Sequence, residues 1–133
     1  MAKSTSLGPC GLAFLRIVVG IIFLAHGWQK ITTMGFHGTE GMFAKIGIPV
    51  PLVSAAVVIL VEFLGGIALI LGLATRWASL LLVVDMLGAI YFVHMRNGFF
   101  LTHGGYEFAL SLLAACVALA LGGGGSLALD SLI

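Results

Sequence analysis

The sequence predicts an all-α membrane protein, a bundle of four transmembrane helices with a short amphipathic segment in the first loop. Hydrophobic residues make up 61% of the 133 residues, and charged residues only 8%. Six basic and five acidic side chains cannot cover a water-soluble domain, in which about 25% of residues are usually charged. Four apolar stretches approach the roughly 20 residues that a helix needs to cross a bilayer. We interpret residues 1–133 as a single transmembrane domain.

The same composition excludes two other classes of protein. Disordered chains are poor in apolar residues, so this chain is not one of them. A net charge of +1 provides no basic stripe to neutralise phosphates, and we therefore expect no nucleic-acid partner. The expected surroundings are the lipid bilayer.

The four predicted spans are apolar on all sides, which excludes the alternating pattern of a membrane β-strand. Proline and glycine mark their ends: Gly8-Pro9 precedes the first span, Pro49-Val50-Pro51 opens the second, and Gly122 to Gly125 follow the fourth. The predicted spans are residues 12–28, 52–73, 77–95 and 106–121, of which the last is the shortest.

An even number of crossings places both termini on one side of the membrane, together with the turn at Thr75-Arg76. We call this the terminal side. The loops at residues 29–50 and 96–105 then lie on the opposite, loop side. Three Lys or Arg residues fall on each side, so the positive-inside rule leaves the orientation open.

The first loop contains a stretch with helical periodicity. Met42, Phe43 and Ile46 recur at helical spacing within residues 39–46. This pattern predicts a short amphipathic helix that lies in the membrane interface or folds back over the bundle. An ordinary loop with a few apolar residues is the alternative.

Three ionisable residues fall inside the predicted spans, where a charge is costly. At 1.5 Å per residue, Arg16 lies roughly 6 Å from the terminal side, Asp85 roughly 12 Å and Glu62 roughly 16 Å. We expect them to form a buried charge network, because pairing lowers the cost of burying an ion. Such a network either holds the helices together or, since acid exceeds base, forms a proton path or the polar wall of a cavity.

All four histidines, His26, His37, His94 and His103, fall on the loop side. Three interpretations stay open. The amphipathic imidazole ring is suited to a membrane interface. His26 and His94, at equal depth on separate helices, could hydrogen-bond a polar headgroup such as a quinone. They could instead be axial haem ligands, or His103 with Glu107 could contribute to a metal site, although no metal-ligand spacing motif is present.

An ordered series of short motifs extends along nearly the whole chain. The motifs are Leu15-Arg16, Phe23 to Lys30, Gly47-Ile48-Pro49, Glu62 to Gly66, Gly72 to Arg76, His94 with Asn97-Gly98-Phe99, Gly104 to Leu110, and Ser126 to Asp130. This series resembles the DoxX family. The resemblance implies a four-helix protein of the bacterial or archaeal cytoplasmic (inner) membrane, connected with quinone or thiol redox chemistry.

Residues and resemblance together lead us to expect a quinone-linked redox subunit, with the quinone headgroup between the first, third and fourth spans on the loop side. His26 and His94 would bind the quinone carbonyls, and His103 would lie in the same site. Glu107 and Tyr106 would assist proton delivery, and Arg96 would stabilise negative charge.

Two other functions stay open. One is a non-catalytic membrane anchor or assembly subunit for a soluble oxidoreductase. The other is a proton-coupled small-molecule transporter, which with four helices would favour a homodimer. The expected partners are accordingly a second copy of the chain, or a soluble or membrane oxidoreductase subunit.

Overall fold

The structure is a computed structural model that describes residues 7–133, and these residues are almost entirely helical. After residue 89 the chain continues through a π-helical turn, η1 (Ile90–His94), and two 3₁₀ turns, η2 (Met95–Asn97) and η3 (Leu101–His103). A last 3₁₀ turn, η4 (Leu129–Leu132), lies in the C-terminal tail, residues 123–133. The α-helices are α1 (Gly8–Thr32), α2 (Gly35–Lys45), α3 (Pro51–Leu71), α4 (Thr75–Ala89) and α5 (Glu107–Gly122).

The expected count of four helices is not confirmed, because the described residues form five α-helices. The predicted amphipathic segment of the first loop is a full helix, α2, of 11 residues. Three segments are long and apolar enough to cross a membrane: Gly8–Thr32, Pro51–Leu71 and Thr75–Asn97. The apolar helix α5 has only 16 residues, about 24 Å at 1.5 Å per residue, which is less than the roughly 30 Å of a bilayer core.

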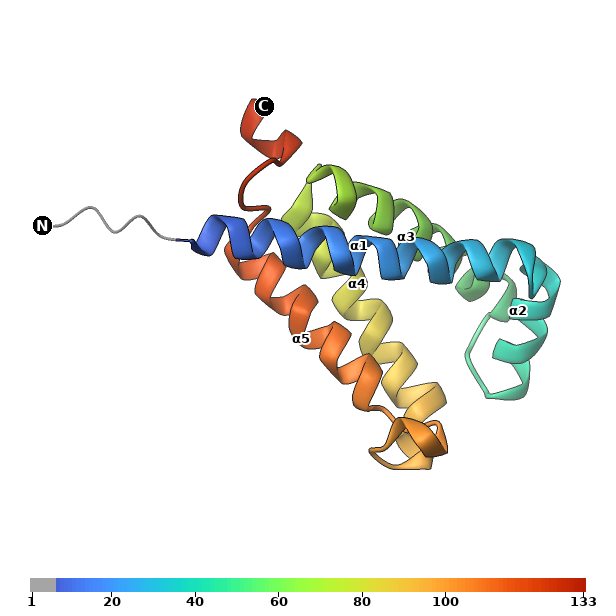
Figure 1. Cartoon of the computed structure of the whole chain (residues 1–133). Coiled ribbons are helices and arrows are strands. Elements are labelled where there is room, and N and C mark those ends of the chain that lie inside the picture. The colour runs from blue at the N-terminus through green and yellow to red at the C-terminus, as the bar shows by residue number, and fades with distance from the viewer. Residues whose placement is uncertain (1–6) are drawn as a thin grey trace, which may run out of the picture.

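The helices form two antiparallel pairs, α1 with α3 and α4 with α5, which lie close together near the chain termini (Figure 1). From there the pairs diverge, α1 and α3 toward α2, and α4 and α5 toward the turns that join them. The core between the pairs consists of buried apolar side chains from α1, α3, α4 and α5. Its largest fully buried members are Phe23, Leu69, Leu82 and Leu119.

The pair α1 and α3 packs with backbone against backbone. A Cβ atom added to Gly66 would lie 2.5 Å from the backbone nitrogen of Leu24, and one added to Gly27 would lie 2.7 Å from that of Phe63. Gly20 meets the carbonyl oxygen of Gly66 in the same way. Glycine lets membrane helices approach this closely, so these three residues allow the tight packing of α1 against α3.

Arg16 does not join the network with Glu62 and Asp85 that the sequence predicts. Its guanidinium group is fully buried and donates hydrogen bonds of 2.8–3.2 Å to five backbone carbonyl oxygens instead. The carbonyl groups at the end of α3 lack the N–H partners of the helix interior and carry partial negative charge, so they suit a cation. The Leu69 carbonyl oxygen also accepts a hydrogen bond from the backbone nitrogen of Gly72 at 3.2 Å. The five acceptors belong to Leu69, Ile70, Gly124, Ser126 and Leu127.

The C-terminal tail is fixed to the same end of the molecule. The backbone nitrogen of Ser126 donates to the carbonyl oxygen of Pro9 at 3.0 Å, and that of Asp130 donates to Gly72 at 2.9 Å. The Asp130 carboxylate accepts hydrogen bonds from the backbone nitrogens of Ala74 and Thr75. Asp130 therefore caps the start of α4 from 55 residues away in the sequence.

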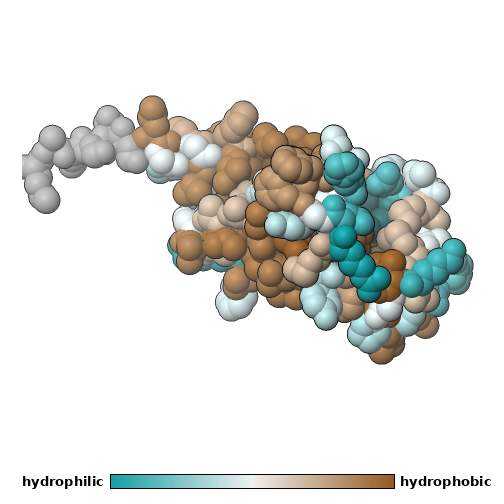
Figure 2. Space-filling model, turned by 90° about the horizontal axis from the view of Figure 1, so that it is seen from below, coloured by the Kyte–Doolittle hydropathy of each residue, from teal (hydrophilic) through white to brown (hydrophobic). Residues whose placement is uncertain are grey.

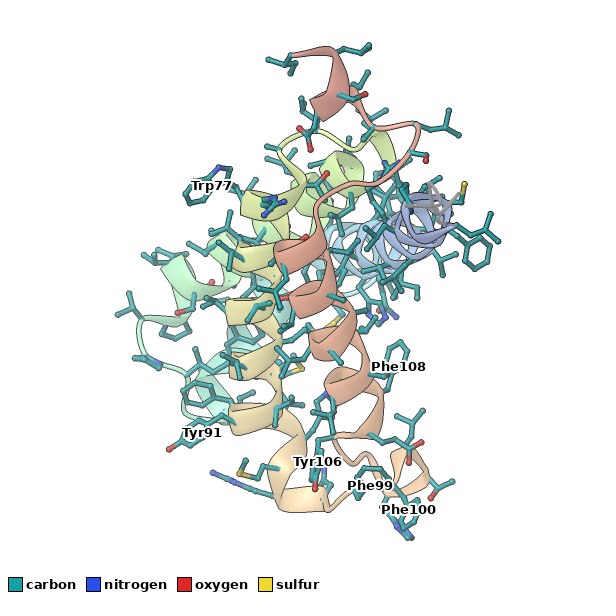
Figure 3. All side chains as sticks on the ribbon, turned by 90° about the vertical axis from the view of Figure 1, so that its left-hand side faces the viewer. Trp77, Tyr91, Phe99, Phe100, Tyr106 and Phe108 are labelled. Atoms are coloured by element: carbon teal, nitrogen blue, oxygen red, sulfur yellow. The ribbon has the colours of Figure 1, made fainter. Side chains whose placement is uncertain are left out.

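The outer surface suits a bilayer. Apolar residues cover most of the face in Figure 2, and hydrophilic residues gather toward the end opposite the N-terminus. Trp77 and Tyr91 project outward near the two ends of the α4–η1 segment (Figure 3), with exposed fractions of 73% and 65%. Aromatic side chains at two levels are typical of the interfaces on either side of a membrane.

Candidate functional site

A cavity of about 520 Å³ lies where the two helix pairs diverge. Side chains from all five α-helices and from η1 line it, and most of them are apolar. Phe43 and Met42 of α2 form part of its wall on the loop side. Five of the lining residues carry the polar groups that the following paragraphs describe: His26, Lys30, Glu62, Asp85 and His94.

Lys30 and Glu62 form an ion pair in the cavity wall. Lys30 Nζ lies 2.8 Å from Glu62 Oε2, and the exposed fractions of the two side chains are 15% and 6%. Both charges are therefore largely removed from water, where each partner greatly lowers the cost of burying the other.

Asp85 of α4 lies within hydrogen-bonding reach of Glu62 and close enough to Lys30 for an electrostatic interaction. Its Oδ2 atom is buried and has no hydrogen-bond partner within the described part of the chain. One ammonium group thus faces two carboxyl groups across the cavity wall. Of the buried network that the sequence predicts, the structure brings Glu62 and Asp85 together, and Lys30 takes the place expected for Arg16.

His94 ends the π-helical turn η1 and lines the cavity. Its Nδ1 atom lies 2.9 Å from the carbonyl oxygen of Gly104, which can only accept a hydrogen bond. Nδ1 therefore carries a proton, and in the neutral ring Nε2 keeps its lone pair. Short π-helical turns are often found at functional sites.

His26 lies on α1, one helical turn before Lys30, and lines the same cavity. Its ring contacts that of Phe108 in α5, with 6.3 Å between ring centroids. The structure thus brings His26 and His94 to one cavity from different helices. Whether they bind a ligand there stays a prediction.

The other expected site residues do not line the cavity. Arg96 and His103 are exposed in the turns after η1. Tyr106 packs edge-on against Phe99, with 5.5 Å between ring centroids. Glu107 accepts a hydrogen bond of 3.1 Å from the backbone nitrogen of Leu101, so its carboxylate holds the loop before α5. These four residues thus lie outside the cavity wall, and a role for them in ligand binding stays a prediction.

One feature of the cavity differs from the sequence prediction. We expected the first span to end at Trp28, which leaves Lys30 in a loop, whereas α1 continues to Thr32. The four-residue spacing of His26 and Lys30 places both on one helix face. This spacing could have indicated that Lys30 belongs to the helix and lies beside His26. The wall formed by α2 agrees with one of the two placements predicted for the amphipathic segment, a helix that folds back over the bundle with Met42 and Phe43 on its apolar face.

The arrangement gives no geometric support to a metal site. Among residues 7–133, no three or more His, Cys, Asp or Glu side chains come close enough together to hold a metal ion. His103 and Glu107, the pair considered for such a site, both lie away from the cavity.

The chain is similar to several bacterial proteins. It is 37% identical to CatD of Bacillus subtilis, named as a candidate oxidoreductase, over the whole chain and 92% of that protein. It is 35% identical to an uncharacterized membrane protein of Mycobacterium tuberculosis, over 92% of this chain and 81% of that protein. Its identity to the Escherichia coli inner membrane protein YphA is 34%, over 65% of this chain and 60% of that protein.

No solved structure matches the chain. The DoxX family model matches residues 11–95, which include His26, Lys30, Glu62, Asp85 and His94. This match and the similarity to CatD over the full chain establish the family. The chain therefore belongs to the DoxX family of membrane proteins.

Proposed function

We propose that this protein is the quinone-binding membrane subunit of a redox system in the bacterial inner membrane, with the quinone headgroup in the cavity between the helix pairs. The observation that carries this proposal is the cavity itself, in which an apolar wall surrounds a few converging polar groups. Ligand sites for small molecules commonly have this composition, and their volumes are about 300–1,000 Å³.

The residues of the cavity fit a quinone headgroup chemically. The apolar walls from α3 and α4 suit the ring and a hydrocarbon tail, which gain from leaving water. His26 and His94 supply ring nitrogens from two helices, and Lys30 adds a cation beside Glu62. Imidazole groups both form hydrogen bonds and transfer protons near neutral pH.

Reduction of a quinone takes up two electrons and two protons. In our proposal, one protein handles the protons and another exchanges the electrons. This chain binds and orients the headgroup, and His94, Glu62 and Asp85 handle protons. A partner oxidoreductase exchanges the electrons. The name of CatD as a candidate oxidoreductase agrees with such a connection.

The cavity can be filled without disturbing the packing of the helices. Gly88 of α4 lines the cavity, and a Cβ atom there would meet nothing within 4 Å. Gly88→Leu therefore places a bulky side chain at the cavity with little strain. Gly11→Leu is the matched control, because Gly11 lies on an exposed part of α1 with the same open space.

The test is a titration of the purified protein in lipid nanodiscs with decylubiquinone, followed by tryptophan fluorescence. We expect saturable binding by the wild type and by Gly11→Leu, and at least tenfold weaker binding by Gly88→Leu. Equal binding by all three proteins would show that the quinone binds elsewhere on the protein. A wild type that binds no quinone would contradict the proposal and favour the docking or transport roles.

A further inference from the structure

The wall of the cavity is not equally buried on all sides. Four apolar side chains line the cavity and are nevertheless more than half exposed, with exposed fractions of 51–67%. A side chain as small as valine that both lines a cavity and is exposed to this extent lies at its rim. The four residues are Val53 and Val57 of α3 and Leu81 and Val84 of α4, so the cavity reaches the outer surface between these two helices.

The other sides of the cavity are covered. Phe43 of α2 forms the wall on the loop side and is only 5% exposed. Between α1 and α5, the lining residue that is exposed is Phe108, and its ring packs against the ring of His26. Toward the chain termini the helix pairs meet in the core around Phe23 and Leu82. Within residues 7–133, the cavity is therefore open on the side between α3 and α4.

This opening lies at the depth of the lipid chains. Trp77, Leu81 and Val84 recur at spacings of four and three residues, so they share one outward face of α4. Val84 is seven residues from both Trp77 and Tyr91, about 10 Å from each at 1.5 Å per residue, and these two aromatic residues project at the two interface levels (Figure 3). The rim thus faces hydrocarbon rather than water, and a ligand can pass between the bilayer and the cavity without crossing an aqueous phase.

We propose that the ligand enters the cavity from the bilayer between α3 and α4, and that an apolar chain attached to its headgroup stays in this lateral opening, rimmed by Val53, Val57, Leu81 and Val84. This inference rests on the quinone-binding function proposed above and adds the class of ligand, a quinone with a long hydrocarbon chain. Such a chain concentrates the ligand in the bilayer, from which the opening is reached. The rim residues determine the specificity for the chain.

The first test is photolabelling of the wild type in lipid nanodiscs with a decylubiquinone analogue that carries a diazirine at the end of its chain. Peptide mass spectrometry locates the label, and an excess of decylubiquinone shows which label depends on the site. We expect this competed label within residues 53–57 and 81–84. Competed label on α2 or near Phe108 of α5 would overturn the inference. Label that the competitor leaves unchanged everywhere would also overturn it, because the chain would then lie in bulk lipid.

The second test is a substitution at the rim. In lipid, the fit of an apolar chain depends on van der Waals packing, so Val84→Phe should crowd the chain while leaving the space of the headgroup free. We expect Val84→Phe to bind decylubiquinone at least about tenfold more weakly. Its affinity for dimethoxymethylbenzoquinone, which has the same headgroup without the decyl chain, should change little.

Val18→Phe is the matched control, because Val18 of α1 is also exposed but does not line the cavity. Its affinities for both compounds should equal those of the wild type. A loss by Val84→Phe that is the same for both compounds, or no loss for either, would overturn the inference and leave the quinone site intact. A wild type that binds neither compound would remove the proposed function as well.

Discussion

Lys30 Nζ lies 2.8 Å from Glu62 Oε2, and this contact joins the last turns of α1 to the middle of α3 inside a largely apolar wall. The two residues are 32 positions apart in the sequence. The same pair joins two helices and supplies the charge at one side of the cavity.

Removal of one partner of this ion pair should cost more stability than removal of both charges. Lys30→Met leaves the Glu62 carboxylate buried and unpaired, so we expect a loss of about 3–5 kcal/mol in the free energy of unfolding. The double variant Lys30→Met/Glu62→Gln should recover most of this loss. Unfolding in mixed micelles measures both, with Lys45→Met at an exposed position of α2 as the control. Additive effects would contradict a direct pair.

The close approach of α1 and α3 predicts a strong effect of a single methyl group. Gly66→Ala places a Cβ atom 2.5 Å from the backbone nitrogen of Leu24, so the two helices must move apart. We expect a loss of about 1–3 kcal/mol, as for other overpacked positions. Gly11→Ala on the same pair of helices meets nothing within 4 Å and should be neutral or slightly stabilising. Thermal denaturation in detergent compares the two, and equal midpoints would exclude the backbone contact.

Arg16→Lys should loosen the C-terminal tail although it preserves the charge. An ammonium group has three donors and cannot reach the five carbonyl oxygens that the guanidinium group satisfies. Each buried carbonyl left unpaired costs about 1–3 kcal/mol. We expect a loss of at least about 2 kcal/mol and faster proteolysis within residues 123–133. Arg96→Lys, at an exposed position, should leave the cleavage rate unchanged.

The cap that Asp130 provides to α4 should depend on pH. Burial raises the pKa of Asp130, but the hydrogen bonds from Thr75 and Ala74 outweigh it and hold the pKa below its ordinary value of 3.8. Since the folded pKa is the lower one, the stabilisation is complete above the unfolded pKa and is lost as pH falls through the folded value. Thermal midpoints between pH 3 and 6 should show this loss, in the same window as faster cleavage of the tail.

Asp130→Asn should remove most of this pH dependence and cost about 1 kcal/mol at neutral pH, as for the loss of a helix cap. Glu40→Gln, a carboxylate on α2 that lies 3.4 Å from His37, is the control and should keep the acid-dependent loss. A wild type whose tail is equally protected at pH 3 and pH 6 would contradict the assigned role of Asp130.

The helical segments could largely be predicted from the sequence, because a long apolar run has few alternatives in a bilayer. The predicted second span, residues 52–73, and α3, Pro51–Leu71, differ by only a residue or two at each end. The partner of each buried charge could not be predicted in the same way. Depth along a helix places Arg16 near the terminal side, but it does not show that backbone carbonyls from the tail satisfy the guanidinium group.

Some of the residues that line the cavity could also be predicted from their positions along the helices. His26 and His94 share a level in the membrane, which is a property of their positions along the helices. Arg96, His103 and Glu107 lie outside the cavity because of the path of the turns between η1 and α5. Hydrogen bonds such as Leu101 to Glu107 decide the path of this loop, and no periodicity in the sequence encodes them.

The contacts of Arg16 have a consequence for the biogenesis of the protein. Three of its five acceptors follow it by 108 to 111 residues, so they are synthesised long after α1 has left the ribosome. Until then, the guanidinium group must find water or lipid headgroups as temporary partners. The hydrogen bonds between Arg16 and the C-terminal tail therefore form late in folding, after the last helix and the tail have been synthesised.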